Sequence, residues 1–152
     1  MYQRVLVPLD GSRVAEAILP FIEQIAGPLD MEVLLVRVVP LTSMDVAAMA
    51  KESQAGAPIL KELDAQGYLE PLVASLKAKG VRAGARVRIG DPATEIVAAA
   101  KEINADLIAM TTHGRSGLGR LLFGSVAEAV LRGSPIPVFL LRTSEAALES
   151  AA

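Results

Sequence analysis

The sequence contains no cysteine and no tryptophan, and only 3% of its 152 residues are aromatic. The lack of cysteine excludes disulfide bonds, thiolate catalysis and zinc sites built from sulfur ligands. The scarcity of aromatic rings argues against a surface that stacks single-stranded nucleic acid bases. The net charge is only −2, so the chain also lacks the broad positive field that DNA- and RNA-binding proteins use.

Long apolar segments are also missing. The longest run, residues 135–141, is far shorter than the roughly 18 residues that cross a bilayer. Pro8 and Asp10 interrupt the first apolar stretch, so a signal peptide is not expected either. Hydrophobic residues nevertheless make up 52% of the chain, which indicates a folded globular domain. The expectation is a soluble, cytoplasmic protein that binds neither nucleic acid nor membranes.

Short apolar runs alternate with segments of helical periodicity. The runs predict five strands, at residues 5–9, 31–39, 81–89, 105–111 and 136–141. Between them, apolar residues at helical spacing predict four helices, at about 13–26, 58–79, 92–104 and 126–132. Residues 41–56 show no firm period and are expected to form a loop or an irregular helix start. One domain should span residues 1–142, followed by a flexible tail at 143–152.

This alternation is typical of an α/β fold. The prediction is a five-stranded parallel sheet with helices on both faces, of the Rossmann-like kind. Such sheets bind ligands outside the carboxyl ends of their strands, where the strand order reverses. Polar or glycine clusters follow only the first and fourth predicted strands, at Pro8–Ser12 and Thr111–Ser125. If these two strands are neighbours, both clusters face the same crevice.

The second cluster is a glycine-rich loop between a strand and a helix. Such a loop exposes backbone N–H groups at the positive end of a helix, which favours phosphate binding. The loop matches neither common phosphate motif. Arg120 and Leu121 stand where a Walker A loop needs Lys and Ser or Thr, and Leu122 stands where a dinucleotide motif needs Gly or Ala.

The two clusters together resemble the universal stress protein family. The similarity rests on Pro8–Ser12 and on Thr-His-Gly114, nine further residues and then Gly124-Ser125, and it extends from Val5 to Arg142. The resemblance implies an adenine nucleotide alpha-hydrolase-like fold and a homodimer formed through the last strand. It also implies ATP binding through a Gly-x2-Gly-x9-Gly-Ser/Thr loop.

The family motif maps onto this chain with one departure. Gly114 and Gly124 are its second and third glycines and Ser125 is its hydroxyl residue, but Thr111 replaces the first glycine. The resemblance also implies that the Val38 backbone contacts adenine. The full set of predicted nucleotide-binding residues is Pro8, Asp10, Val38, Met110, Thr111, His113, Gly114, Arg115, Gly124, Ser125 and Val126.

Several of these residues have a structural alternative. Asp10 is expected to bind the ribose or to help hold Mg²⁺ beside the phosphates, but it also suits an Asx-turn before a helix. Ser125 followed by Glu128 has the spacing of a capping box. His113 is the only histidine, so a metal site or a hydrolytic pair is disfavoured, and loop packing or a phosphate contact is expected instead. Arg115 is expected either to neutralise phosphate charge or to be solvated.

The sequence therefore favours a small ATP-binding homodimer that acts as a stress-response regulator or switch, through an unidentified protein partner. Any ATP hydrolysis should be slow. The main alternative is a dimeric interaction module of the same fold that binds no nucleotide, and Thr111 is the residue that favours it. The dimer is expected because the apolar strand 136–141 would be exposed at a sheet edge. A monomer whose tail covers that strand is the alternative.

Overall fold

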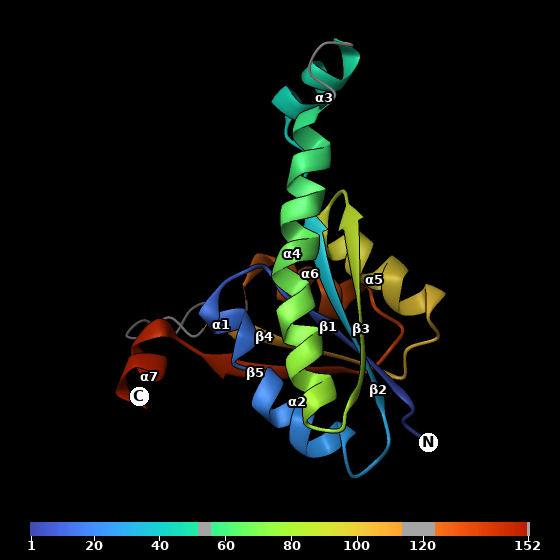
Figure 1. The fold of residues 1–152 in the computed structure, drawn as a ribbon, viewed down its shortest axis with the longest axis vertical. Coiled ribbons are helices and arrows are strands. Elements are labelled where there is room, and N and C mark those ends of the chain that lie inside the picture. The colour runs from blue at the N-terminus through green and yellow to red at the C-terminus, as the bar shows by residue number, and fades with distance from the viewer. Residues whose placement is uncertain (52–55, 114–123, 152) are drawn as a thin grey trace.

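The computed structural model describes residues 1–51, 56–113 and 124–151. One parallel sheet has the strand order β3-β2-β1-β4-β5, so the predicted fold class is confirmed (Figure 1). The strands are β1 (Arg4–Pro8), β2 (Glu32–Val39), β3 (Arg82–Ile89), β4 (Leu107–His113) and β5 (Val138–Thr143). The chain moves outward from β1 to β3 and then returns to β4, so the order reverses at β1.

Helices pack on both faces of this sheet. The helices of the described chain are α1 (Arg13–Glu16), α2 (Leu19–Ala26), α3 (Ser43–Ala50), α4 (Gly56–Ala78), α5 (Pro92–Glu102), α6 (Ser125–Gly133) and α7 (Glu145–Ser150). One buried cluster joins the sheet to α1, α2 and α4, and a second joins the opposite face to α5 and α6. No helix in the described ranges combines the length and apolar character needed to cross a bilayer.

The central strand β1 supplies side chains to both clusters. Val5 and Val7 pack toward α2 and α4, and Leu6 between them packs toward α5 and α6. All three side chains are fully buried. Burial of each side chain contributes about 1.5–3 kcal/mol to stability. Because these side chains alternate between the two faces and are buried on both, they hold β1 at the centre of the sheet.

The first predicted helix is wrong in one respect, because the segment 13–26 forms two helices. α1 ends at Glu16 and α2 begins at Leu19, with Pro20 in its first turn. Proline has no N–H, and its ring clashes with the carbonyl four residues earlier in a continuous helix. A new helix therefore begins at Leu19. The spacing of apolar residues alone did not reveal this break.

Residues 43–50 form the regular helix α3, in a segment expected to be a loop or an irregular start. The helix begins with a capping box. The Thr42 N–H donates to Asp45 Oδ2 over 2.8 Å, and the Asp45 N–H donates to Thr42 Oγ1 over 3.1 Å. Lys61 Nζ lies 2.6 Å from Asp45 Oδ1 and joins α3 to α4. These bonds, that of Lys61 first, hold the pKa of Asp45 well below its usual range.

The other helix ends agree more closely with the sequence. Ser12 and Asp91 cap α1 and α5, each accepting a hydrogen bond from a backbone N–H three residues on. α4 continues through Pro71 without a break. Beyond Thr143, Ser144 caps the helix α7, so residues 145–150 are helical. Whether this segment moves as a flexible tail stays a prediction.

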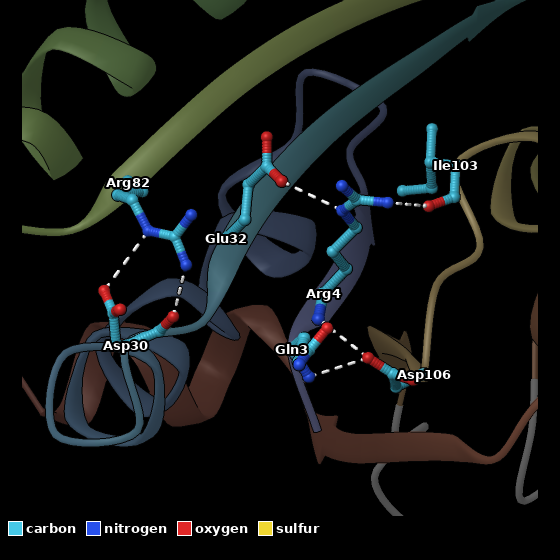
Figure 2. Close-up of polar contacts among 7 residues, drawn as sticks. All are labelled: Gln3, Arg4, Asp30, Glu32, Arg82, Ile103 and Asp106. Atoms are coloured by element: carbon cyan, nitrogen blue, oxygen red, sulfur yellow. Dashed lines mark hydrogen bonds and ion pairs between the residues drawn. The ribbon is translucent and has the colours of Figure 1, made fainter. Parts of the chain in front are cut away.

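A group of polar contacts fixes the start of β1 at the amino edge of the sheet (Figure 2). Asp106 Oδ2 accepts hydrogen bonds from the N–H groups of Gln3, at 2.7 Å, and Arg4, at 2.9 Å. The Arg4 guanidinium donates to Glu32 Oε2 and to the Ile103 carbonyl. The two backbone bonds lower the pKa of Asp106, so its charged form stabilises the junction of β1 and β4.

Replacing Asp106 with Asn is expected to lower the free energy of unfolding at pH 7, and by less as the pH falls. A carboxyl group with a lowered folded-state pKa stabilises the protein above its unfolded pKa, about 3.9. That contribution is lost as the pH falls through the folded-state pKa. Urea denaturation of both proteins, from neutral pH to about pH 3, measures the difference.

Glu62→Gln, which changes an exposed carboxyl on α4, is the matched control and should leave stability unchanged. A pH-independent loss of stability in Asp106→Asn would contradict the electrostatic explanation.

Candidate functional site

A cavity of about 670 Å³ lies at the carboxyl edge of the sheet. Its size falls within the range of roughly 300–1,000 Å³ typical of small-molecule sites. The ends of β1, β2 and β4 form its floor, and α4, α5 and α6 contribute to its walls. Eight predicted site residues line it together: Pro8, Asp10, Val38, Met110, Thr111, Gly124, Ser125 and Val126.

The cavity exists because β1 is shorter than its neighbours. The Leu9 N–H still donates a hydrogen bond to the Val36 carbonyl of β2, at 2.8 Å. Because successive residues direct their backbone groups to opposite sides, the backbone nitrogen of Pro8 points toward β4. Proline has no N–H to offer that strand. The paired register of β1 with β4 accordingly ends at Leu6 and Ile108, while β4 continues to His113. After Leu9 the chain leaves the sheet, which opens a crevice between β2 and β4.

The loop after β1 forms the Asx-turn that was the structural alternative for Asp10. Asp10 Oδ1 accepts a hydrogen bond from the Ser12 N–H at 2.9 Å, and Ser12 then caps α1 through the Ala15 N–H. Gly11 between them has a φ of +88°, a conformation that suits glycine. Asp10 is exposed and lines the cavity, so this turn also presents the carboxylate to a ligand.

Thr111, the departure from the family motif, does not fill the cavity. Its hydroxyl donates to the Ala15 carbonyl over 3.2 Å, at the end of α1. That carbonyl belongs to the last turn of a short helix, where carbonyls lack helical partners. The Thr111 side chain therefore braces β4 against α1, and the cavity retains its volume beside it.

Thr112 was not predicted, yet it positions the loop end. Its side chain is buried, and its Oγ1 accepts a hydrogen bond from the Gly124 N–H at 2.8 Å. This bond ties the start of α6 to the end of β4. A threonine at the end of a strand that precedes a glycine-rich loop was the available signal. Its hydrogen-bond partner, however, depends on where the start of α6 lies relative to β4, and the sequence does not give that position.

Among the described residues, the backbone N–H groups in the first turn of α6 have no partner, and this turn faces the cavity. Gly124 is the N-cap and forms no side-chain capping bond, and Ser125, Val126 and Ala127 line the cavity. The first N–H groups of a helix have no helical partners and carry its partial positive charge. This end of α6 therefore offers a group of donors suited to an anion.

The predicted capping box at Ser125 is wrong. A capping box needs its serine at the N-cap, but Gly124 holds that position and Ser125 is the first helical residue. The Glu128 N–H bonds the Gly124 carbonyl at 2.9 Å, and the Glu128 side chain accepts from Arg132 instead. Ser125 therefore does not compete for the donors at the helix start.

The peptide groups of Val38 face the same cavity from β2. The Val36 carbonyl points toward β1, where Leu9 bonds it, and the Val39 carbonyl points toward β3, where Gly90 bonds it at 3.0 Å. Because alternate residues of a strand direct their peptide groups to opposite sides, Val38 directs its N–H and C=O toward β1. β1 has already ended at that level, so both groups face the cavity.

The wall of the cavity toward α5 and α6 is apolar. Ile96, Met110, Val126 and Ala127 line it, and Met110 is buried among the core residues on that face of the sheet. An apolar wall beside the free peptide groups of Val38 suits a flat heterocycle that carries a few polar atoms at its edge.

The opposite wall carries charged side chains that the sequence analysis missed. Arg37 on β2 lines the cavity there, together with Lys61 and Asp64 on α4. Lys61 is the partner of Asp45, so its charge is already compensated. These residues are far apart in the sequence, and only the packing of α4 against the sheet brings them together.

The metal prediction rests on Asp10. No group of three or more His, Asp or Glu side chains in the described part of the chain is arranged to hold a metal ion. Mg²⁺ at a phosphate site needs only one or two carboxylates, because phosphate oxygens and water complete its coordination. Asp10 and Asp64 both line the cavity, and this donor set fits a magnesium ion that arrives with a polyphosphate.

Three predicted site positions remain to be placed. His113 is the last residue of β4. The prediction for its side chain, like those for Gly114 and Arg115, lies outside the described residues.

The chain is similar to known proteins along most of its length. A universal stress protein of Methanothermobacter thermautotrophicus is 35% identical over 150 residues, which cover 94% of this chain and 97% of the relative. The structure of MJ0577 from Methanocaldococcus jannaschii matches with a TM-score of 0.78 and 27% identity, over 95% of this chain and 99% of that protein.

A universal stress protein whose structure was determined in complex with cAMP matches with a TM-score of 0.66 and 26% identity, over 94% of this chain and 98% of that protein. The sequence model of the universal stress protein family matches residues 1–142. With this match and the shared fold, the chain belongs to the universal stress protein family.

Proposed function

We propose that this protein binds ATP in the cavity at the carboxyl edge of the sheet and acts as a regulator or switch. The observation that carries the proposal is that the start of α6 and the peptide groups of Val38, neither of which has a partner among the described residues, meet in one cavity of nucleotide size. A relative that was solved with cAMP supports an adenine nucleotide as the ligand.

In this proposal the three parts of ATP meet three surfaces. The adenine lies on the apolar wall near Pro8, Met110 and Val126, with its polar edge at the Val38 backbone. The ribose lies near Asp10 and Thr111. The phosphates lie at Gly124 and Ser125, where the helix amides and the dipole of α6 favour negative charge. Asp10 assists a magnesium ion bound to the phosphates.

A protein-interaction module is the second candidate function, and it is favoured by an exposed apolar surface. Large apolar side chains that are more than half exposed gather on α3 and the first half of α4: Met44, Val46, Met49, Ile59, Leu60 and Leu63. Leu69 and Leu76 face the core from the opposite side of α4. Exposed apolar patches of this kind mark interaction sites. Such a surface is also compatible with nucleotide binding, because a switch needs a protein partner.

Titration calorimetry is expected to show Mg-ATP binding with a dissociation constant on the order of micromolar, weakened at least about tenfold in Gly124→Val. Among the described residues, a Cβ at Gly124 would have Thr112 Oγ1 at 4.0 Å as its nearest contact, so the fold accommodates valine. Its methyl groups would then stand beside the amides that the phosphates need.

Gly133→Val, the same substitution at the other end of α6, is the matched control. A Cβ there meets no described atom within 4 Å, so binding should be unchanged. Wild-type protein that gives no heat with Mg-ATP would contradict the proposal and favour the interaction module.

We further propose a homodimer through β5. This strand pairs with β4 on one side, and no strand of the described chain lies on its other side. The strand runs two residues later than predicted, and Phe139 on it is exposed. Helix α7, which the alternative placed over the strand, contacts α1 beyond the end of β5 (Figure 1). A second copy of β5 would satisfy the free edge.

Light scattering coupled to size-exclusion chromatography is expected to give a dimer for the wild type and a monomer for Phe139→Asp. Phe21→Asp, at an exposed phenylalanine on α2, should remain dimeric. A wild-type monomer at micromolar concentration would refute the shared edge.

A further inference from the structure

Arg37 occupies a defined position on the charged wall of the cavity. Its guanidinium lies over the ring of Tyr68 on α4, 4.8 Å from the ring centroid. On the side of the loop after β1, a Cβ at Gly11 would lie only 3.1 Å from Arg37 Nη1. The missing side chain at Gly11 therefore leaves room for the guanidinium between that loop and α4.

The support beneath Arg37 is itself held in place. The Tyr68 hydroxyl donates to Glu16 Oε2 over 2.9 Å, which joins α4 to α1. Burial, followed by the bond to Glu16, raises the pKa of Tyr68 above its usual range, so the hydroxyl remains a donor. The aromatic ring thus offers a fixed face to the cation, and cation–π contact with such a ring orients an arginine.

The charge of Arg37 is not neutralised within the described residues. None of the described ion pairs involves it, whereas Lys61 on the same wall is paired with Asp45 at 2.6 Å. Arg37 is only partly exposed and lines the cavity. Its planar set of N–H donors matches the oxygens of a phosphate group, which it binds through paired hydrogen bonds.

We propose that Arg37 is a second anion-binding point of the cavity and binds a phosphate group of the nucleotide. It lies on the α4 side of the sheet, across the cavity from the start of α6. A phosphorylated ligand would be held between the two, and the site would discriminate against the corresponding nucleoside. This inference rests on the proposed nucleotide function. It identifies Arg37 as the residue that makes the site require a phosphate group on its ligand.

The test compares the binding of ATP and of adenosine to wild-type protein, Arg37→Met and Arg37→Lys by titration calorimetry. Arg37→Met is expected to weaken ATP binding about ten- to a hundredfold, because a hydrogen-bonded charge pair is lost, and to change adenosine binding less than about threefold. Arg37→Lys keeps the charge without the planar donor set, so its affinity for ATP should lie between those of the wild type and Arg37→Met.

Arg86→Met is the matched control. Arg86 is exposed on the neighbouring strand β3 and does not line this cavity, so the same change of charge there should leave both affinities unchanged. Thermal unfolding monitored by circular dichroism establishes that each variant is folded, and Arg37→Lys serves as the test if Arg37→Met does not fold.

Two results would overturn the inference while leaving nucleotide binding intact. An unchanged ATP affinity in Arg37→Met would show that no phosphate contacts the guanidinium. Equal losses for ATP and adenosine would show that Arg37 only supports Tyr68 and the loop after β1. Wild-type protein that binds neither ligand would instead overturn the proposed function, and the inference with it.

Discussion

The early end of β1 is the constraint on which the candidate site depends. The central strand β1 has five residues, whereas its neighbours β2 and β4 have eight and seven. Pro8 lacks the N–H that would continue the pairing of β1 with β4. Past this point no strand of the described chain lies between β2 and β4. The free peptide groups of Val38 and the start of α6 both face the resulting space. The cavity is therefore a consequence of strand length at the point where the sheet order reverses.

The residues around this space hold the backbone in place and leave donors directed into it. Asp10 forms a turn, Thr111 braces β4 against α1, and Thr112 fixes the first residue of the α6 N-terminus. Each side chain satisfies a backbone group that the irregular chain would otherwise leave unpaired. Ser125 does not cap the amides of α6, so among the described residues the positive end of this helix stays available to a ligand.

Much of the fold was predictable because apolar periodicity records which faces are buried. The order of strands and helices along the chain, and the parallel sheet that this order implies, follow from local patterns. The errors have local causes too, since Pro20 and the Thr42–Asp45 box carry signals that hydrophobic spacing ignores. Arg37 and Lys61 could not be found this way, because their place in the site depends on how α4 packs against β2.

The most direct test of the central claim is an amide NMR titration of the protein with Mg-ATP. The account predicts that the resonances of Val38, Ser125 and Val126 shift together and saturate at one dissociation constant, because these three amides border one bound nucleotide. Shifts confined to the opposite edge of the sheet, around Arg4 and Glu32, would contradict it, as would a spectrum that Mg-ATP leaves unchanged.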